Sequence, residues 1–260
     1  MHSPWSPGSR QLPGQSPRQW RQCRANGIAH SPVAERAGRW QAAGLRRGQF
    51  KPGASASPGN LRGVTEERSA SPDFAAELYR YLQEARDRVL SRLDGLGEYD
   101  IRRPLTPTGT NLLGLVKHLT SIEFGYLGDC LGRPAPIRLP WVEDGSIWDS
   151  ADMWATPAES RADLAGLYQA AWRHSDESIS ELGLTAPAHV PWWPEHRDTT
   201  SGALLIRVLA ETAQHAGHAD IIRELIDGRG GQDHDDVGDA HWWASYLTRI
   251  QQAADAFKHR

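Results

Sequence analysis

VLAETAQHAGHADIIRELIDG, residues 208–228, is the most informative segment of this 260-residue chain. At about 100° per residue, a helix through this segment gathers six residues into a stripe about 80° wide. They are Leu204, Val208, Glu211, His215, His218 and Ile222. Three of the six are aliphatic, so the stripe is expected to face a protein core. Titratable residues interrupt that buried face, and an unpaired carboxylate there would be strongly destabilising. We expect them to be paired or to bind a ligand.

The rest of the chain predicts further helices and no convincing strand. Apolar residues recur at helical spacing over 74–93, 112–126, 156–182, 201–227 and 239–257. Thr110 is expected to cap the second helix, and Thr156-Pro157-Ala158-Glu159 supplies a capping box at the start of the third. The predicted fold class is therefore all-α, a four-helix bundle with an additional C-terminal helix.

Two irregular stretches between these helices contain five tryptophans. Trp141, Trp148 and Trp154 lie within 133–155, and the other two lie within TAPAHVPWWPEHRDTT, residues 185–200. Because large aromatic side chains are seldom left fully in water, these loops are expected at one end of the bundle, around a pocket or a subunit contact. Trp192 and Trp193 are the candidate substrate-pocket residues.

The net charge of −3 is an average over two unlike parts of the chain. Residues 1–72 hold 11 Lys and Arg against 3 Asp and Glu, a charge of +8, and the remainder holds 18 against 29, a charge of −11. The first part is rich in proline and glycine and has no periodicity, which predicts a disordered basic tail. The abrupt change of composition raises the hypothesis that the native protein starts at Val64. The helical domain is expected over 73–260.

Cysteine usage and apolar content bear on the compartment of the protein. Only Cys23 and Cys130 occur, far apart in sequence, which argues against a disulfide framework and favours the cytoplasm. The longest apolar stretch, 203–210, contains Arg207 and is far shorter than the ~18 residues of a membrane span. The tail's arginines are dispersed, so a nucleic-acid partner is not favoured. The absence of a Gly-rich phosphate loop, a GxSxG elbow or a CxxC pair disfavours nucleotide-dependent, serine-hydrolase and zinc-ribbon chemistry.

Glu211 and His215 are one helical turn apart, a spacing that lets a carboxylate oxygen and an imidazole nitrogen converge on one cation. His118 is the best candidate for a third ligand, because apolar residues flank it on the second helix and Gly125 leaves room nearby. Such donors suit Zn²⁺ first, and also Ni²⁺ or Fe²⁺. Three protein ligands leave one coordination position open, which indicates catalysis or ligand capture.

Simpler interpretations apply to the same residues. A Glu-x-x-x-His pair on a helix is commonly a solvated ion pair. His218 is expected to hydrogen-bond a metal ligand rather than to be one, and Cys130 is expected to be a small core residue. The remaining histidines in polar or loop surroundings are expected at the surface: His174, His189, His196, His234 and His241.

Three segments together resemble a known family. NLLGLVKHLTSIEFGYLG at 111–128, ETAQHAGHADIIRELIDG at 211–228 and HWWASYLTRIQQAA at 241–254 are similar to the DinB superfamily, in particular to its DUF664 branch. The resemblance covers about 74–257. It implies an up-down-down-up bundle, often a homodimer, with a divalent metal held by His118, Glu211 and His215. Many members have histidine where this chain has Glu211, whereas the mycothiol-dependent maleylpyruvate isomerases share the glutamate.

The resemblance also implies a low-molecular-weight thiol as co-substrate, mycothiol or bacillithiol. A free thiol has a pKa of about 8.5, and coordination to a metal holds it as the nucleophilic thiolate. The leading hypothesis is a metal-dependent thiol S-transferase or isomerase acting on a small electrophile. One alternative is a non-catalytic metal-binding stress-response protein with a closed coordination sphere. Another is a metal-free hydrogen-bonded network whose basic tail contacts nucleic acid.

Overall fold

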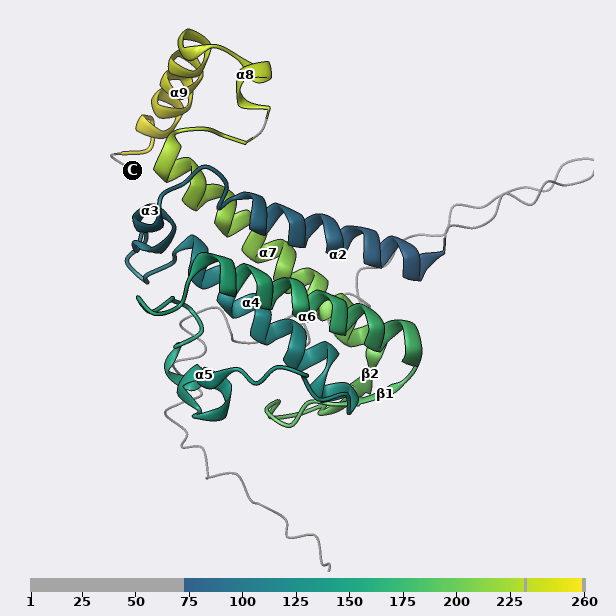
Figure 1. Ribbon diagram of the computed structural model, residues 1–260. Coiled ribbons are helices and arrows are strands. Elements are labelled where there is room, and N and C mark those ends of the chain that lie inside the picture. Colours follow the sequence, from purple (N-terminus) through teal and green to yellow (C-terminus); the bar gives the residue numbers. More distant parts are fainter. Residues whose placement is uncertain (1–72, 232, 259–260) are drawn as a thin grey trace, which may run out of the picture. The chain divides into compact units, whose positions relative to one another are not determined.

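The computed structural model describes residues 73–231 and 233–258 (Figure 1). The predicted tail over 1–72 and the proposed start at Val64 lie outside these residues. Four long helices form a bundle and confirm the predicted all-α class; short helices connect them, and one short and one long helix follow the bundle. The helices are α2 (Phe74–Ser91), α3 (Glu98–Arg102), α4 (Leu112–Leu127), α5 (Pro140–Glu143), α6 (Arg161–Leu182), α7 (Ser201–Asp227), α8 (His234–Val237) and α9 (Ala240–Asp255).

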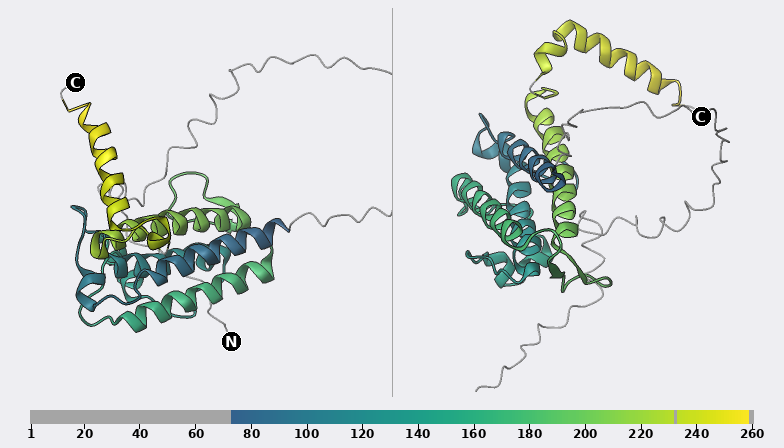
Figure 2. Two further views of the ribbon diagram at one scale, coloured as in Figure 1. Left: turned by 90° about the horizontal axis from the view of Figure 1, so that it is seen from above. Right: turned by 90° about the vertical axis from the view of Figure 1, so that its right-hand side faces the viewer.

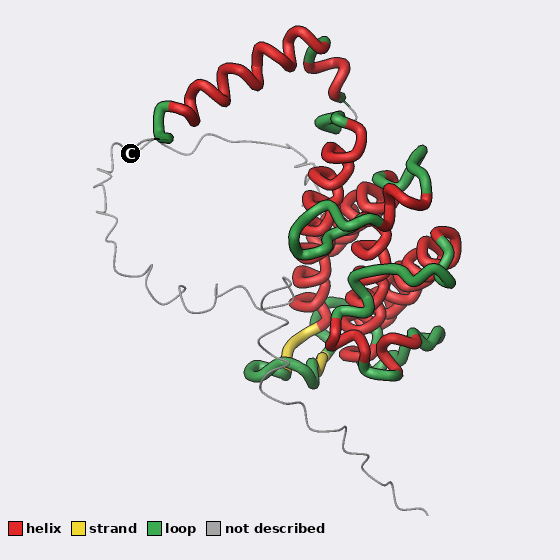
Figure 3. Tube along the Cα trace, turned by 90° about the vertical axis from the view of Figure 1, so that its left-hand side faces the viewer, coloured by secondary structure: helices red, strands yellow, loops and turns green. Residues whose placement is uncertain are grey.

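The prediction that no strand occurs is wrong for one short ribbon. β1 (Pro187–His189) and β2 (Asp198–Thr200) pair antiparallel, with Ala188 opposite Thr199 (yellow in Figure 3). Strands of three residues are too short to show an alternating pattern, so periodicity could not reveal them. The ribbon closes the loop that carries Trp192 and Trp193 and leads directly into α7.

Two helix starts differ from the sequence prediction. The N-cap of α4 is Asn111 and not Thr110, because the Asn111 side chain accepts a hydrogen bond from the backbone N–H of Gly114 at 2.8 Å. The third long helix begins at Arg161, after Ser160, rather than at Thr156. Residues ahead of it form a turn, and Ser160 then supplies the cap that the helix needs.

The predicted capping-box glutamate does bind the backbone N–H of Thr156, at 2.7 Å from Glu159 Oε2. The same carboxylate also pairs with the ammonium of Lys117 on α4, 2.9 Å away, and the helix begins two residues later, at Arg161. This ion pair holds the start of α6 beside the first half of α4, so the two helices run parallel. The start of α6 also touches the end of α2, where Arg161 donates to the carbonyl of Leu93, so α2 and α6 are antiparallel.

The end of α4 lies beside the start of α7, where the Arg207 guanidinium lies over the Tyr126 ring at 5.6 Å. Helices α4 and α7 are therefore antiparallel, and the bundle has the up-down-down-up order that the family resemblance implies. Figure 2 shows α2, α6 and α7 running side by side. No helix in the described part of the chain is long and apolar enough to span a bilayer.

Two clusters of buried apolar side chains fill the bundle. One centres on the first half of α4 with the end of α2, α6 and the last half of α7, and the other joins the start of α2 and the end of α4 to the start of α7. Cys130 lies in the second cluster as a free, buried thiol, as the sequence indicated. Between these clusters, a buried ion pair links Arg86 of α2 to Glu123 of α4.

Candidate metal centre

His118 projects from the middle of α4 into the bundle and is almost fully buried. Its Nδ1 atom is 2.7 Å from Oδ2 of Asp152, which is itself 1% exposed and lies in the loop between α5 and α6. In the neutral ring, Nδ1–H donates to this carboxylate and the lone pair is on Nε2. Histidine metal ligands have this arrangement, in which the outer nitrogen donates to a carboxylate and the inner one faces the ion.

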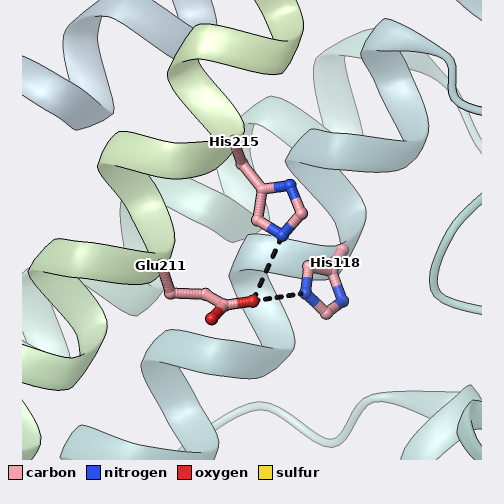
Figure 4. A group of neighbouring side chains, drawn as sticks. All are labelled: His118, Glu211 and His215. Atoms are coloured by element: carbon pink, nitrogen blue, oxygen red, sulfur yellow. Dashed lines mark hydrogen bonds and ion pairs between the residues drawn. The ribbon is translucent and has the colours of Figure 1, made fainter. Parts of the chain in front are cut away.

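Glu211 and His215 approach His118 from α7, as the helical stripe predicts (Figure 4). The distance from His215 Nε2 to Glu211 Oε1 is 3.2 Å, and the distance from His118 Nε2 to the same oxygen is 3.7 Å. The ligand atoms of the three residues all lie within 4.8 Å of one another. The tertiary structure therefore brings together the three residues that the sequence proposed as ligands.

These separations fit a small divalent cation. Two donors that each lie 2.1 Å from a tetrahedral ion are about 3.4 Å apart. This separation falls between the distances from Glu211 Oε1 to His215 Nε2 and to His118 Nε2, which are 3.2 Å and 3.7 Å. His118 Nε2 is buried and has no hydrogen-bond partner, although buried polar atoms are rarely left unpaired. An ion in contact with Nε2 would satisfy this atom. Two imidazoles and one carboxylate form a donor set typical of zinc and related transition metals.

No other histidine, cysteine, aspartate or glutamate of the described residues joins the three as a possible ligand. The second oxygen of Glu211, Oε2, is instead 3.4 Å from the guanidinium of Arg207, one turn earlier on α7. Arg207 thereby occupies one carboxylate oxygen and leaves Oε1 directed at the two histidines. Arg207 and Asp152 are thus the residues that orient the group.

Neither orienting residue was identified from the sequence. Asp152 belongs to an irregular loop without periodicity and meets His118 across 34 positions of sequence, so no local pattern could have revealed it. Arg207 is four residues before Glu211 and could have been found from that spacing. In the sequence, Arg207 otherwise stands out only as a charge that interrupts the apolar stretch 203–210.

The surroundings give the three residues different protonation states. Burial favours the neutral ring of His118, but the hydrogen bond with Asp152 and the nearby negative charge of Glu211 outweigh it and raise the pKa of His118 to about 9. Burial also opposes the charge on Glu211, yet its contacts with His118, His215 and Arg207 keep the pKa of that carboxyl well below its ordinary value. Burial and the neighbouring charge of His118 lower the pKa of His215. Glu211 is thus ionised and His215 neutral at neutral pH, the forms in which both bind metals.

His218 lies beside the group without joining it. Its Nδ1 atom is 3.2 Å from Nδ1 of His215, so the two rings meet through the nitrogen of His215 that faces away from Glu211. His218 therefore contacts His215 and is not among the three residues whose ligand atoms converge. Of the histidines expected at the surface, His174 is half-buried and hydrogen-bonds the carbonyl of Arg133 at 2.9 Å.

The tryptophans of the two loops divide into separate environments. Trp141 is buried in the core and donates to Ser121 Oγ at 2.8 Å. Trp192 and Trp193 both have their indole N–H groups 3.2 Å from the hydroxyl of Tyr126. A Cβ at Gly125 would lie 3.5 Å from Trp192, so this glycine leaves room for the indole.

Tyr126 connects the tryptophan loop to the candidate metal centre. The guanidinium of Arg207 lies over the Tyr126 ring, and the same guanidinium contacts Glu211. A continuous set of contacts therefore runs from Trp192 and Trp193 through Tyr126 and Arg207 to the metal-facing carboxylate. The tryptophans are half-buried, which leaves part of each indole accessible.

Comparison with known proteins identifies the family. The family model described as mycothiol-S-transferase matches residues 77–228, which include all three candidate ligands. The chain belongs to the mycothiol-S-transferase family. This match confirms the resemblance that the α4 and α7 motifs indicate. It ends at Gly228, the C-cap residue of α7, so α9 lies outside the matched segment. The family name denotes transfer chemistry at the sulfur of mycothiol.

Two further comparisons add little to this assignment. A solved structure described as a conserved protein from Enterococcus faecalis is similar over 61% of this chain and 100% of its own, with 12% identity and a TM-score of 0.48. No curated protein matches the chain.

Proposed function

We propose that this protein is a metal-dependent thiol S-transferase that joins mycothiol, or a similar low-molecular-weight thiol, to a small electrophile. The observation that carries the proposal is the convergence of His118, Glu211 and His215, with one orphaned imidazole nitrogen, inside a bundle of the mycothiol-S-transferase family. In this proposal the three residues bind a divalent metal, with zinc the first candidate and nickel or iron the others. Such an ion would lower the pKa of a thiol in its open position and hold it as the thiolate.

The residues of the chain prepare the site for that chemistry. Asp152 keeps the Nδ1 proton of His118 and thereby directs the Nε2 lone pair inward. Arg207 restrains Glu211 so that one oxygen faces the histidines. His215 stays neutral because its pKa is lowered, so it needs no deprotonation before it binds. Since only three side chains converge, one coordination position remains for the thiol.

The proposed reaction forms one carbon–sulfur bond. The thiol sulfur attacks an electrophilic carbon with its electron pair, and the bond from that carbon to its leaving group breaks and gives that group the electrons. The thiol proton passes to solvent. An isomerase of the same type would instead add the sulfur reversibly to an unsaturated substrate. We propose Trp192 and Trp193 as the wall that binds the apolar part of the electrophile, because they connect to the centre through Tyr126 and Arg207.

Two features favour turnover over the non-catalytic alternative. His218 approaches the far side of the His215 ring, so it does not complete a closed coordination sphere. The tryptophan loop is also close enough to the centre to share a chain of direct contacts with it. We further propose that the protein acts in the cytoplasm as a homodimer, in line with its family resemblance and its two isolated cysteines.

The test combines metal analysis with a conjugation assay. Purified protein is measured for bound metal, and mycothiol is offered together with 1-chloro-2,4-dinitrobenzene as a generic electrophile. We expect about one metal per chain and a conjugation rate well above the uncatalysed one, with both lost in His215→Ala. His189→Ala is the matched control, because His189 is exposed on β1, where it pairs with Asp198. Equal rates in wild type and His215→Ala, without metal in either, would remove the proposal.

A further inference from the structure

Helix α9 is amphipathic but buries none of its residues. Trp242, Tyr246 and Ile250 recur every four residues along one side, and they are 37%, 38% and 49% exposed. Leu247, at 60%, extends this apolar face. An amphipathic helix with its apolar side in water lacks the packing that normally stabilises it. The α9 face, as we call Trp242, Tyr246, Leu247 and Ile250, therefore lacks a partner within the described chain.

Helix α7 also has an apolar surface without a partner, since it is apolar on two sides and only one of them faces the core. One side carries Leu204, Val208 and Ile222 into the bundle core. The opposite side exposes a row of apolar and small residues at helical spacing, here called the α7 stripe. Its members are Ile206, Ala210, Ala213, Gly217, Ile221 and Leu225. A helix that is apolar all round is usually covered on all sides, yet Ile221 and Leu225 are 59% and 57% exposed.

The two surfaces match in length, and the charge of α9 does not oppose the contact. The 16 residues of α9 make a helix about 24 Å long at about 1.5 Å per residue, and the α7 stripe spans about 28 Å by the same rule. A groove of about 1000 Å³ between α2 and the end of α7 includes Ile221 in its wall and is lined by seven carboxylates against four guanidinium groups. The α9 segment from Asp239 to Lys258 carries two basic and two acidic side chains, so it adds no net negative charge to this surface.

The connection between the two helices prevents α9 from covering its own α7. Directly after α7, Arg229 pairs with Asp235 of α8 at 2.7 Å, and the N–H of Gly230 donates to Nδ1 of His234 at 3.0 Å. The His234 ring stacks on Trp243 of α9, with centroids 4.6 Å apart. These contacts fix the first turn of α9 to the residues that end α7, so turning α9 back along α7 would break them.

We propose that the α9 face packs on the α7 stripe of a second copy of this chain, in a reciprocal exchange that forms a twofold dimer. A contact about 24 Å long and about 10 Å wide covers roughly 240 Å² on each of the two helices that meet. Two symmetric contacts therefore bury about 1,000 Å² in total, at the lower limit of a stable interface. The contact uses residues beyond the segment that matches the family model, so it is independent of the proposed reaction. It also gives the expected homodimer a defined surface.

Sedimentation velocity on the full chain tests the exchange with three variants of exposed isoleucines. Ile221→Glu places a charge in the α7 stripe and Ile250→Lys places one in the α9 face. Ile137→Glu, in the loop before α5 and 37% exposed, is the matched control. We expect dimers for wild type and the control, and at least a tenfold larger dissociation constant for each of the other two. Circular dichroism verifies that every variant is folded.

Mixing the two weakened variants distinguishes reciprocal exchange from other arrangements. A heterodimer of the Ile221→Glu and Ile250→Lys chains has one fully native contact and one in which the new charges are opposite, whereas either homodimer has two damaged contacts. The mixture should therefore regain the dimer. A monomeric wild type would overturn the proposal, as would an Ile221→Glu variant that stays dimeric, which indicates pairing of α9 with α9. A mixture that remains monomeric would also overturn it.

Discussion

Asp152→Asn tests how the loop between α5 and α6 tunes the candidate metal centre. The substitution preserves the shape of the side chain and an oxygen that can accept the Nδ1–H of His118, but it removes a buried negative charge 2.7 Å from the ring. Loss of a carboxylate behind a histidine ligand typically lowers metal affinity about 10–100-fold. Here a second effect of the opposite sign acts on the same ring.

That second effect is competition by protons. The pKa of His118 is raised to about 9 in the metal-free protein, so at pH 7.5 a metal must displace a proton, which lowers apparent affinity by a factor of about 30. Without the Asp152 charge, only Glu211 opposes the effect of burial, so the pKa of His118 falls and this competition weakens. The loss of affinity in Asp152→Asn should therefore be small near pH 7.5 and reach about 10–100-fold near pH 9.5.

The assay is a competition titration of zinc with a chromophoric chelator at several pH values between 6.5 and 9.5. In the wild type, affinity should rise about tenfold per pH unit up to about pH 9; in Asp152→Asn, it should rise much less. A purely structural role for Asp152 predicts a ratio of affinities that does not change with pH. That outcome, or equal affinities at pH 9.5, would refute the reasoning.

Three further outcomes follow from buried contacts. Glu123→Leu leaves the buried guanidinium of Arg86 without its main partner, and urea denaturation should show a loss of about 3–5 kcal/mol. Gly114→Ala puts a Cβ against the carbonyl oxygen of Met153, beside Asp152, so it should lower stability by about 1–3 kcal/mol and weaken zinc binding in the same titration. In the metal-free protein, raising pH from about 6.5 to 9 should remove at most about 3 kcal/mol of stability, measured by denaturation at each pH, because the stabilising proton on His118 is lost as pH rises through its folded-state pKa.

Matched controls separate these effects from general damage. Glu84→Ala breaks an exposed pair with Arg80 on α2 and should leave stability almost unchanged, because solvent screens this pair. Gly166→Ala on α6 meets no atom within 4 Å, so it should leave stability unchanged or raise it by about 0.5–1 kcal/mol. Comparable losses in a variant and its control would contradict the assigned contact. A His118→Gln variant that keeps the full pH dependence would contradict the assignment of the proton.

The long helices and the candidate ligands could be predicted because both depend on local spacing. The 3.6-residue period marks the buried face of α7, and Glu211 and His215 interrupt it one turn apart, so their convergence follows from helix geometry alone. Helix starts were harder. Asn111 and Ser160 are the caps instead of Thr110 and Thr156, because their own side chains accept hydrogen bonds from the first turns of α4 and α6.

The orienting groups could not be predicted, because they depend on contacts far apart in sequence. Asp152 lies in a loop whose course is set by packing against α4, including the close approach of Met153 to Gly114. The β1–β2 ribbon also has no local signal, because at the end away from its loop it pairs residues that are eleven or more positions apart in sequence. The sequence alone also cannot say that the apolar α7 stripe is left uncovered by α9.

The sequence by itself determined the helical class, the inward-facing Glu211 and His215, and His118 as the best third candidate, because each follows from helical periodicity. Only the tertiary structure decided that α4 and α7 run antiparallel with these residues at the same level, so that three donor atoms meet within 4.8 Å. It also decided that Asp152 and Arg207 orient them. Periodicity fixes which way a side chain points along one helix, whereas the meeting of two helices and a loop depends on how the whole core packs.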